Sequence, residues 1–139
     1  MHRITLKEVE YIAFELAKEL LSFNEPIPNF TTRFPNILES CLLTPFQTFA
    51  GKQIYSGLIG KAGILFYLMI KNHPFQNGNK RIAMTALLVF LYKNNKWIKA
   101  DTQELYNFIM WIAQSPPKFK EETLMAIERF LKEHIVKLS

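Results

Sequence analysis

Two stretches of almost uncharged residues constrain the fold of this chain more than any other feature. Between Ile54 and Ile70 only Lys61 is charged, and between Ile82 and Tyr92 no residue is charged. Helices that are apolar on nearly every face are buried. The apolar runs within these stretches are too short to cross a bilayer. We therefore expect two buried helices at the centre of an all-α fold, and no membrane segment.

Four further helices are predicted around this pair. Thr5 and Glu8 are spaced as a capping box, which predicts the start of an amphipathic helix. Proline is favoured in a first helical turn, so a short helix is expected over Pro35–Leu43. Asp101 and the pair Pro116–Pro117 each precede another helical pattern. The apolar stripe of the last helix consists of Leu124, Ile127, Leu131 and Leu138.

Little extended structure is expected. Two prolines make Asn24–Asn29 a loop, because proline fixes its own φ and lacks an N–H donor. Thr44–Gln53 is predicted to be a connector, and the one extended piece expected lies near Asn95–Lys99. The chain has 139 residues, a common size for one hydrophobic core. The predicted fold is therefore a compact six-helix bundle in a single domain, residues 1–139.

Composition narrows the function classes. A lone cysteine, Cys41, forms neither an internal disulfide nor a thiolate metal cluster. The formal charge of +5 favours an anionic partner, such as a nucleotide, a nucleic acid or an acidic protein, without choosing among them. The first residues do not have the pattern of a secretory signal, so a cytoplasmic location is expected.

The polar segment between the two central helices carries the candidate chemistry. It reads His73-Pro-Phe-Gln-Asn-Gly-Asn-Lys-Arg81. Pro74 disfavours the α conformation at His73, so the incoming helix should end there and present the imidazole. Phe75 is the one large apolar side chain in the segment, and its burial would anchor the loop with roughly 1.5–3 kcal/mol.

The end of this segment has the properties of a phosphate site. Asn77, Gly78 and Asn79 tolerate positive φ, which lets successive N–H groups turn toward one anion at a helix start. Lys80 and Arg81 then occupy the first helical turn, where the macrodipole disfavours cations. A bound phosphate would resolve this conflict. With His73 as general base, the arrangement suits attack by a hydroxyl on a phosphoryl group.

These nine residues resemble the signature of the Fic family, and specifically its death-on-curing (Doc) branch, H-x-F-x-[D/N]-[A/G]-N-K-R. The flanking apolar helices and the upstream segment Leu43-Thr-Pro-Phe-Gln-Thr-Phe-Ala-Gly51 are similar too. The resemblance implies a Fic fold and a nucleotide-dependent transferase with ATP and Mg²⁺. Fic enzymes with glycine at the position of Lys80 transfer AMP to a protein hydroxyl. The lysine form is associated with transfer of the γ-phosphate to a threonine of elongation factor Tu.

Further expectations follow from the resemblance. Asn77 stands where an acidic residue usually helps to hold Mg²⁺, and it offers only a neutral carbonyl oxygen. The flap that aligns the target protein would lie in Thr44–Gln53, with Thr48, Phe49 and Gly51 at its centre. A toxin that blocks translation would be neutralised by a separately encoded antitoxin, whose disordered tail folds as a helix against it.

Other readings remain open from the sequence. AMP transfer uses the same base and the same phosphate site. A catalytically weakened interaction protein would keep only a partner groove, and a nucleic-acid-binding module is disfavoured because no aromatic and basic residues alternate. Catalysis is not expected of His2, in the N-terminal segment, or of His134, beside the apolar stripe of the last helix. Packing is expected of Cys41, and close helix packing of the small residues of Gly57–Gly63.

Overall fold

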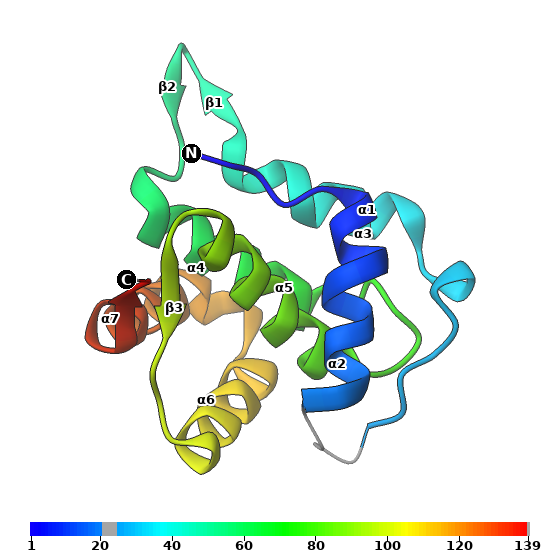
Figure 1. Cartoon of the computed structure of the whole chain (residues 1–139). Coiled ribbons are helices and arrows are strands. Elements are labelled where there is room, and N and C mark those ends of the chain that lie inside the picture. Colours follow the sequence, from blue (N-terminus) through cyan, green and yellow to red (C-terminus); the bar gives the residue numbers. More distant parts are fainter. Residues whose placement is uncertain (21–24, 139) are drawn as a thin grey trace.

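The central helix pair forms as the apolar pattern predicts. The computed structural model describes residues 1–20 and 25–138. Helix α4 spans Gly57–Lys71 and helix α5 spans Asn79–Lys93. The two lie side by side in the middle of the molecule (Figure 1), and every residue in 61–70 and 82–91 is buried. The loop that joins them carries the polar segment.

The N-terminal helix is confirmed, with an irregularity that the pattern does not reveal. It consists of α1 (Leu6–Glu8), a π-helical turn (Val9–Ala13) and α2 (Phe14–Leu20). A π turn breaks the regular hydrogen-bond pattern and leaves carbonyl groups for other partners. At the end of this turn the Thr85 hydroxyl of α5 donates to the Ala13 carbonyl oxygen at 2.7 Å.

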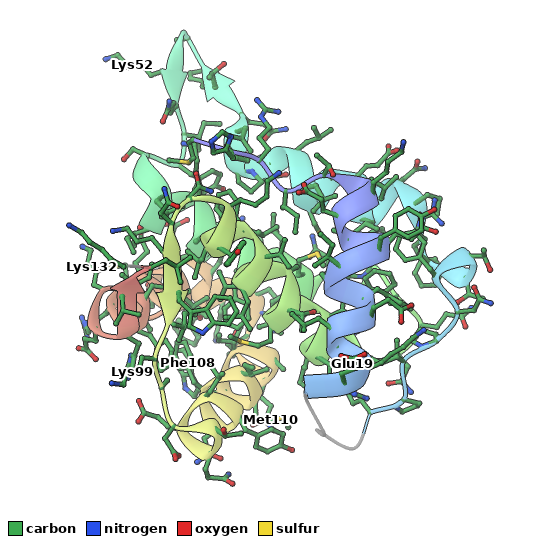
Figure 2. The ribbon with its side chains drawn as sticks, in the orientation of Figure 1. Glu19, Lys52, Lys99, Phe108, Met110 and Lys132 are labelled. Atoms are coloured by element: carbon green, nitrogen blue, oxygen red, sulfur yellow. The ribbon has the colours of Figure 1, made fainter. Side chains whose placement is uncertain are left out.

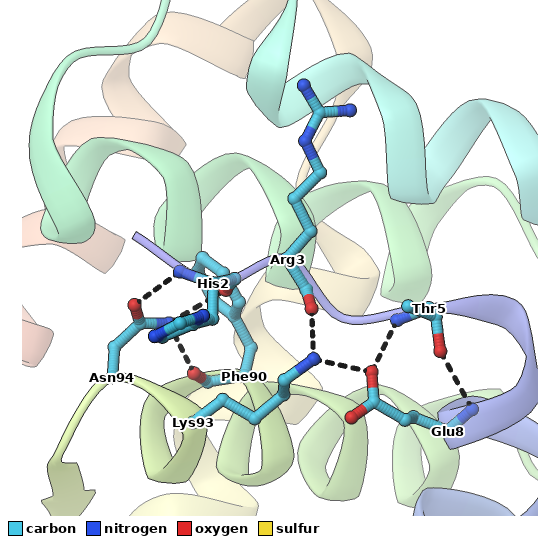
Figure 3. A network of polar contacts seen from close by, with 7 residues as sticks. All are labelled: His2, Arg3, Thr5, Glu8, Phe90, Lys93 and Asn94. Carbon is cyan, nitrogen blue, oxygen red and sulfur yellow. Dashed lines mark hydrogen bonds and ion pairs between the residues drawn. The ribbon is translucent and has the colours of Figure 1, made fainter.

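The capping box at the start of this helix also joins it to α5 (Figure 3). The Glu8 N–H donates to Thr5 Oγ1 at 3.2 Å, and the Thr5 N–H donates to Glu8 Oε1 at 2.9 Å. Lys93, in the last turn of α5, donates to the same Glu8 oxygen at 2.7 Å and also to the Arg3 carbonyl oxygen. The N-terminal segment is thus fixed to the end of the central pair.

The remaining helices surround the pair. Helix α3 spans Pro35–Leu43, as predicted. Helix α6 spans Thr102–Gln114 and is capped by Asp101, whose Oδ2 accepts the Glu104 N–H at 3.0 Å. Helix α7 spans Lys120–His134. Short 3-10 turns cover Phe30–Thr32, Thr44–Phe46 and Pro117–Phe119.

Of the residues that the structure describes, 68% are helical. If the N-terminal helix is counted once, the described residues form six α-helices, which confirms the all-α prediction. No helix in the described part of the chain has the length and apolar character needed to span a membrane.

Two small antiparallel sheets complete the fold. Strands β1 (Thr48–Phe49) and β2 (Lys52–Gln53) form a hairpin with Thr48 opposite Gln53 and Phe49 opposite Lys52. The hairpin projects from the bundle at the top of Figure 1. It was predicted only as a connector, because two-residue strands leave no alternating pattern.

The second sheet pairs β3 (Lys96–Ile98) with β4 (Ile135–Lys137). The extended piece near Asn95–Lys99 was predicted, but its partner was not. The prediction that Leu138 lies on the stripe of the last helix is wrong, because that helix ends at His134. The β-branched residues that follow pair with β3, and the Leu138 N–H donates to the Asn95 carbonyl oxygen at 3.0 Å.

The Glu8 cap gives a testable pH dependence. Burial of Glu8 opposes its ionisation, but hydrogen bonds from Lys93 and Thr5 outweigh burial and hold the pKa below its ordinary 4.5. A lowered pKa stabilises the folded state above the unfolded value, and this contribution is lost as the pH falls through the folded value. Glu8→Gln should therefore lower the free energy of unfolding by about 0.5–1 kcal/mol at pH 7.

The difference between wild type and Glu8→Gln should shrink as the pH falls below 4.5. Urea unfolding at a series of pH values measures it. Glu19→Gln, at an exposed site labelled in Figure 2, serves as the control and should show no such trend. A Glu8→Gln difference that is the same at every pH would contradict this account.

Candidate functional site

His73 lies just beyond the end of α4, on strained backbone. The helix ends at Lys71, and His73 is an exposed residue with a φ of +52°. Pro74 disfavours the right-handed helical conformation at His73, while positive φ is uncommon for residues other than glycine. The Pro74 carbonyl oxygen accepts the Phe34 N–H at 2.8 Å, which ties this turn to the start of α3.

Phe75 fixes the middle of the loop in the core. Only 1% of its surface is exposed. Its ring centroid lies 5.6 Å from that of Phe14 and 6.0 Å from that of Phe30, and these two rings meet edge to face. Three aromatic rings from α2, from the 3-10 turn Phe30–Thr32 and from the loop therefore pack together.

Asn79 clamps the loop with both ends of its side chain. Its Oδ1 accepts the Phe75 N–H at 3.0 Å, and its Nδ2 donates to the Phe75 carbonyl oxygen at 2.9 Å. The residue is 7% exposed. The side-chain amide is therefore held within the protein by both its oxygen and its nitrogen, and the backbone N–H of Asn79 is a donor that α5 leaves for a phosphate.

Gly78 allows the chain to enter α5. It has a φ of +71° and is the residue before the first helical turn. A Cβ at this position would lie 2.9 Å from both the Pro26 carbonyl oxygen and Ile27 Cδ1. The Gly78 N–H donates to Asn77 Oδ1 at 2.8 Å, so that N–H is also occupied. The predicted anion nest is thereby reduced to the following N–H groups, which have no acceptor within the helix.

Lys80 and Arg81 point to different partners. Lys80 Nζ forms an ion pair with the Glu25 carboxylate. Arg81 Nη1 donates to the Glu25 carbonyl oxygen and Nη2 to the Ala17 carbonyl oxygen, each at 2.5 Å. The Arg81 guanidinium thus bonds to the backbone of the end of α2 and of the segment that follows. Of the two cations expected to grip phosphate together, Lys80 is the one that lines the pocket described next.

A pocket of about 340 Å³ joins these features. One wall consists of the loop and the first turn of α5, and the opposite wall is the end of α6, where Figure 2 labels Met110. Lys71 holds the walls together by donating to the carbonyl oxygens of Ala113 and Ser115, at 3.1 and 2.5 Å. The lining residues are Glu25, Ile70, His73, Gln76, Asn77, Gly78, Asn79, Lys80, Met110, Ala113 and Gln114.

Comparison with known proteins identifies the family of this chain. The model of the Fic/DOC family matches residues 3–91. The chain belongs to the Fic/DOC family. It is also 34% identical, over 65 residues, to a protein of Mycolicibacterium smegmatis named Toxin Doc. That match covers 47% of this chain and 50% of the relative, so the chain spans about half the length of the relative. No solved structure matches the chain.

Glu25 is the residue of this Fic/DOC pocket that sequence reasoning missed. Its carboxylate lines the pocket, and Lys80 pairs with Oε2. The other oxygen, Oε1, is buried and has no hydrogen-bond partner among the described residues. A single glutamate in a proline-rich loop gives no periodic or motif signal, and its partner lies far along the chain. The available signal was the pair of cations in the first turn of α5, because the helix macrodipole disfavours cations there unless an anion lies nearby.

Oxygen donors for a metal are few in this pocket. Among the described residues, no group of three or more His, Cys, Asp and Glu side chains is placed to hold a metal. Asn77 offers a side-chain oxygen that already accepts the Gly78 N–H. Glu25 adds a carboxylate with one unpartnered oxygen. This donor set suits Mg²⁺, which takes one or two protein oxygens together with substrate phosphates and water.

The predicted flap lies far from the pocket. Its residues Thr48, Phe49 and Gly51 belong to the hairpin that precedes α4, whereas His73 follows α4. A helix of 15 residues is about 22 Å long, and Figure 1 places the hairpin and the α4–α5 loop on different sides of the bundle. The structure therefore does not bring the flap and His73 together, and the docking role of the hairpin stays a prediction.

The buried Lys61 holds the base of the hairpin. Its Nζ donates to Gln53 Oε1 at 2.8 Å and to the Tyr55 carbonyl oxygen. Burial lowers the pKa of Lys61. Because both acceptors lie within the protein, this lysine belongs to the scaffold rather than to the pocket.

The remaining candidates have structural surroundings. Burial raises the pKa of Cys41 to about 12, so the thiol stays protonated at neutral pH. His134 stacks on Phe130 and faces Glu104, with Nε2 and Oε1 2.8 Å apart. A Cβ on Gly63 would lie 3.4 Å from Glu128 Cγ, which reflects the close approach of α7 to α4.

The contacts around Gly78 predict a graded response to alanine. Gly78→Ala adds backbone strain and contacts with Pro26 and Ile27, and should lower the free energy of unfolding by about 2–4 kcal/mol. Gly51→Ala is the matched control, because its φ of +77° is similar but nothing lies within 4 Å of a Cβ there. It should cost about 1–2 kcal/mol. If thermal or urea unfolding shows the same loss of stability for both variants, Pro26 and Ile27 do not pack against Gly78.

Proposed function

We propose that this Fic/DOC chain is a Doc-like toxin that transfers the γ-phosphate of ATP to a hydroxyl of a protein. One observation carries the proposal. The imidazole of His73 and the ammonium of Lys80 line the same pocket, at the first turn of α5. The family match and the similarity to Toxin Doc support the assignment. The presence of Lys80 within the motif favours phosphate over AMP as the transferred group.

In the proposed reaction the target hydroxyl oxygen attacks the γ-phosphorus. The bond between that phosphorus and the oxygen bridging to the β-phosphate breaks, and ADP leaves with the electron pair. His73 accepts the proton of the hydroxyl as the new bond forms. Its exposed position beyond α4 leaves the ring accessible to an incoming protein segment.

The start of α5 holds the phosphates in this proposal. The backbone N–H groups of Asn79, Lys80 and Arg81 have no acceptor within the helix, and the macrodipole adds to their attraction for an anion. The ammonium of Lys80 contributes a full charge beside them. Mg²⁺ bound with the nucleotide would neutralise part of the phosphate charge. Arg81 acts indirectly, by holding the backbone of Glu25 in place.

The target and partner follow from the family resemblance. The proposed acceptor is a threonine of elongation factor Tu, whose modification would stop translation in the cytoplasm. The proposed antagonist is a separately encoded antitoxin with a helix-forming tail. The net charge of +5 supports an acidic tail. We propose no membrane and no specific nucleic acid as a partner.

Substitution of His73 tests the reaction. The purified chain should add phosphate to elongation factor Tu in the presence of ATP and Mg²⁺, and His73→Ala should lower the rate by about 10²–10⁴-fold. Mass spectrometry of the target identifies the added group. His2→Ala, at an exposed histidine outside the pocket, is the matched control and should keep the wild-type rate.

Each rival has its own outcome in this experiment. A mass increase corresponding to AMP would replace the kinase assignment with nucleotidyl transfer. If the purified chain modifies no target, and production of His73→Ala in bacteria still arrests growth in a companion assay, the chain acts as an interaction protein without catalysis.

A further inference from the structure

Glu25 gives a negative charge to the pocket in which an anion is proposed to bind. It is the only carboxylate among the described residues that line the pocket. Lys80 is the only lysine or arginine in the same lining, and the two are paired. The side-chain charges of the pocket therefore cancel. A triphosphate that enters alone meets a carboxylate and competes with it for Lys80.

The position of Glu25 is built into the fold. Its carbonyl oxygen accepts Arg81 Nη1 at 2.5 Å. The next two residues pack against Gly78, since a Cβ there would lie 2.9 Å from the Pro26 carbonyl oxygen and from Ile27 Cδ1. The backbone of Glu25 is thus held against the first turn of α5, the place where phosphates are proposed to bind.

The two carboxylate oxygens have different surroundings. Oε2 pairs with Lys80, while Oε1 is buried without a hydrogen-bond partner in the described part of the chain. A buried carboxylate oxygen without a partner is costly, so it calls for a cation or a donor that arrives with the ligand. Asn77, in the same pocket, has no charge to offer a metal and already accepts the Gly78 N–H.

We propose that Glu25 provides the carboxylate that binds Mg²⁺ together with the nucleotide, and so makes nucleotide binding depend on the metal. This inference rests on the proposed nucleotide site. Glu25 would hold the metal beside the phosphates, which would release Lys80 from its ion pair to bind the phosphates. One protein carboxylate, phosphate oxygens and water form the donor set that Mg²⁺ prefers. Without the metal, Glu25 repels the phosphates and keeps Lys80.

The test is the ratio of two affinities for a non-hydrolysable ATP analogue, one measured by calorimetry with Mg²⁺ and one in EDTA. In the wild type, Mg²⁺ should strengthen binding by about tenfold or more. In Glu25→Gln this ratio should fall by about fivefold or more, because binding in EDTA improves and binding with Mg²⁺ weakens. Glu133→Gln, at an exposed carboxylate of α7 outside the pocket, should keep the wild-type ratio.

A rescue variant separates metal binding from other effects of charge. Glu25→Gln combined with Asn77→Asp returns a carboxylate to the pocket, and the Mg²⁺ ratio should recover toward the wild-type value. An unchanged ratio in Glu25→Gln overturns the inference. This includes the case in which the affinity for the analogue rises equally with and without Mg²⁺, because Glu25 would then only compete with the nucleotide for Lys80.

A second measurement uses the unaltered chain, in case Glu25→Gln fails to fold. Mn²⁺ replaces Mg²⁺ in the presence of the analogue, and NMR follows the backbone amide signals. The signals of Glu25 and Asn77 should broaden through proximity to the paramagnetic ion. A Glu25 signal that stays sharp while that of Asn77 broadens overturns the inference.

These measurements do not depend on which group is transferred. If the Mg²⁺ ratio responds to Glu25 but no phosphate reaches a protein, the proposed reaction fails and the metal inference stands. If His73-dependent phosphate transfer occurs with an unchanged ratio, only the role of Glu25 fails. If the wild-type chain binds no nucleotide with or without Mg²⁺, both proposals are overturned.

Discussion

The reciprocal pair of hydrogen bonds between the Asn79 side chain and the backbone of Phe75 shapes the whole site. It closes the segment between α4 and α5 on itself, with the aromatic ring of Phe75 on the core side. With these two hydrogen bonds in place, His73 lies outside the bundle, and the first N–H groups of α5 lie at the pocket. Packing and polar chemistry therefore act on the same few residues.

Much of the fold is determined by patterns that a sequence displays directly. The apolar stretches of α4 and α5, the Thr5 cap and the proline that opens α3 each act locally, so each predicts its element. The π turn of Val9–Ala13, the β1–β2 hairpin and strand β4 were not predicted, whereas the extended piece that forms β3 was. Strand β4 depends on tertiary structure, since its partner β3 lies far away in the sequence, and the two-residue strands of the hairpin are too short to leave a pattern. The π turn contacts α5 through the Thr85 hydroxyl, a contact that no local pattern indicates.

The candidate site divides in the same way. The motif from His73 to Arg81 is contiguous, so its conformation follows from proline, glycine and asparagine chemistry. The position of Glu25 depends on how α2 and the residues Glu25–Ile27 pack against the start of α5, which no local pattern encodes. The binding partners of Lys80 and Arg81 could not be predicted either, because from the sequence alone both cations in the first turn of a helix could bind the same phosphate. The structure gives them different acceptors.

The contacts of Arg81 change how its place in the motif is understood. With one nitrogen on the Ala17 carbonyl oxygen and another on that of Glu25, this guanidinium fastens the N-terminal part of the chain to the entrance of α5. An inactive variant at this position would then report a misplaced carboxylate and a shifted helix rather than a lost bond to substrate. A residue can thus belong to a family signature because it holds the pocket together, even when its charged group binds backbone carbonyl oxygens of the protein itself.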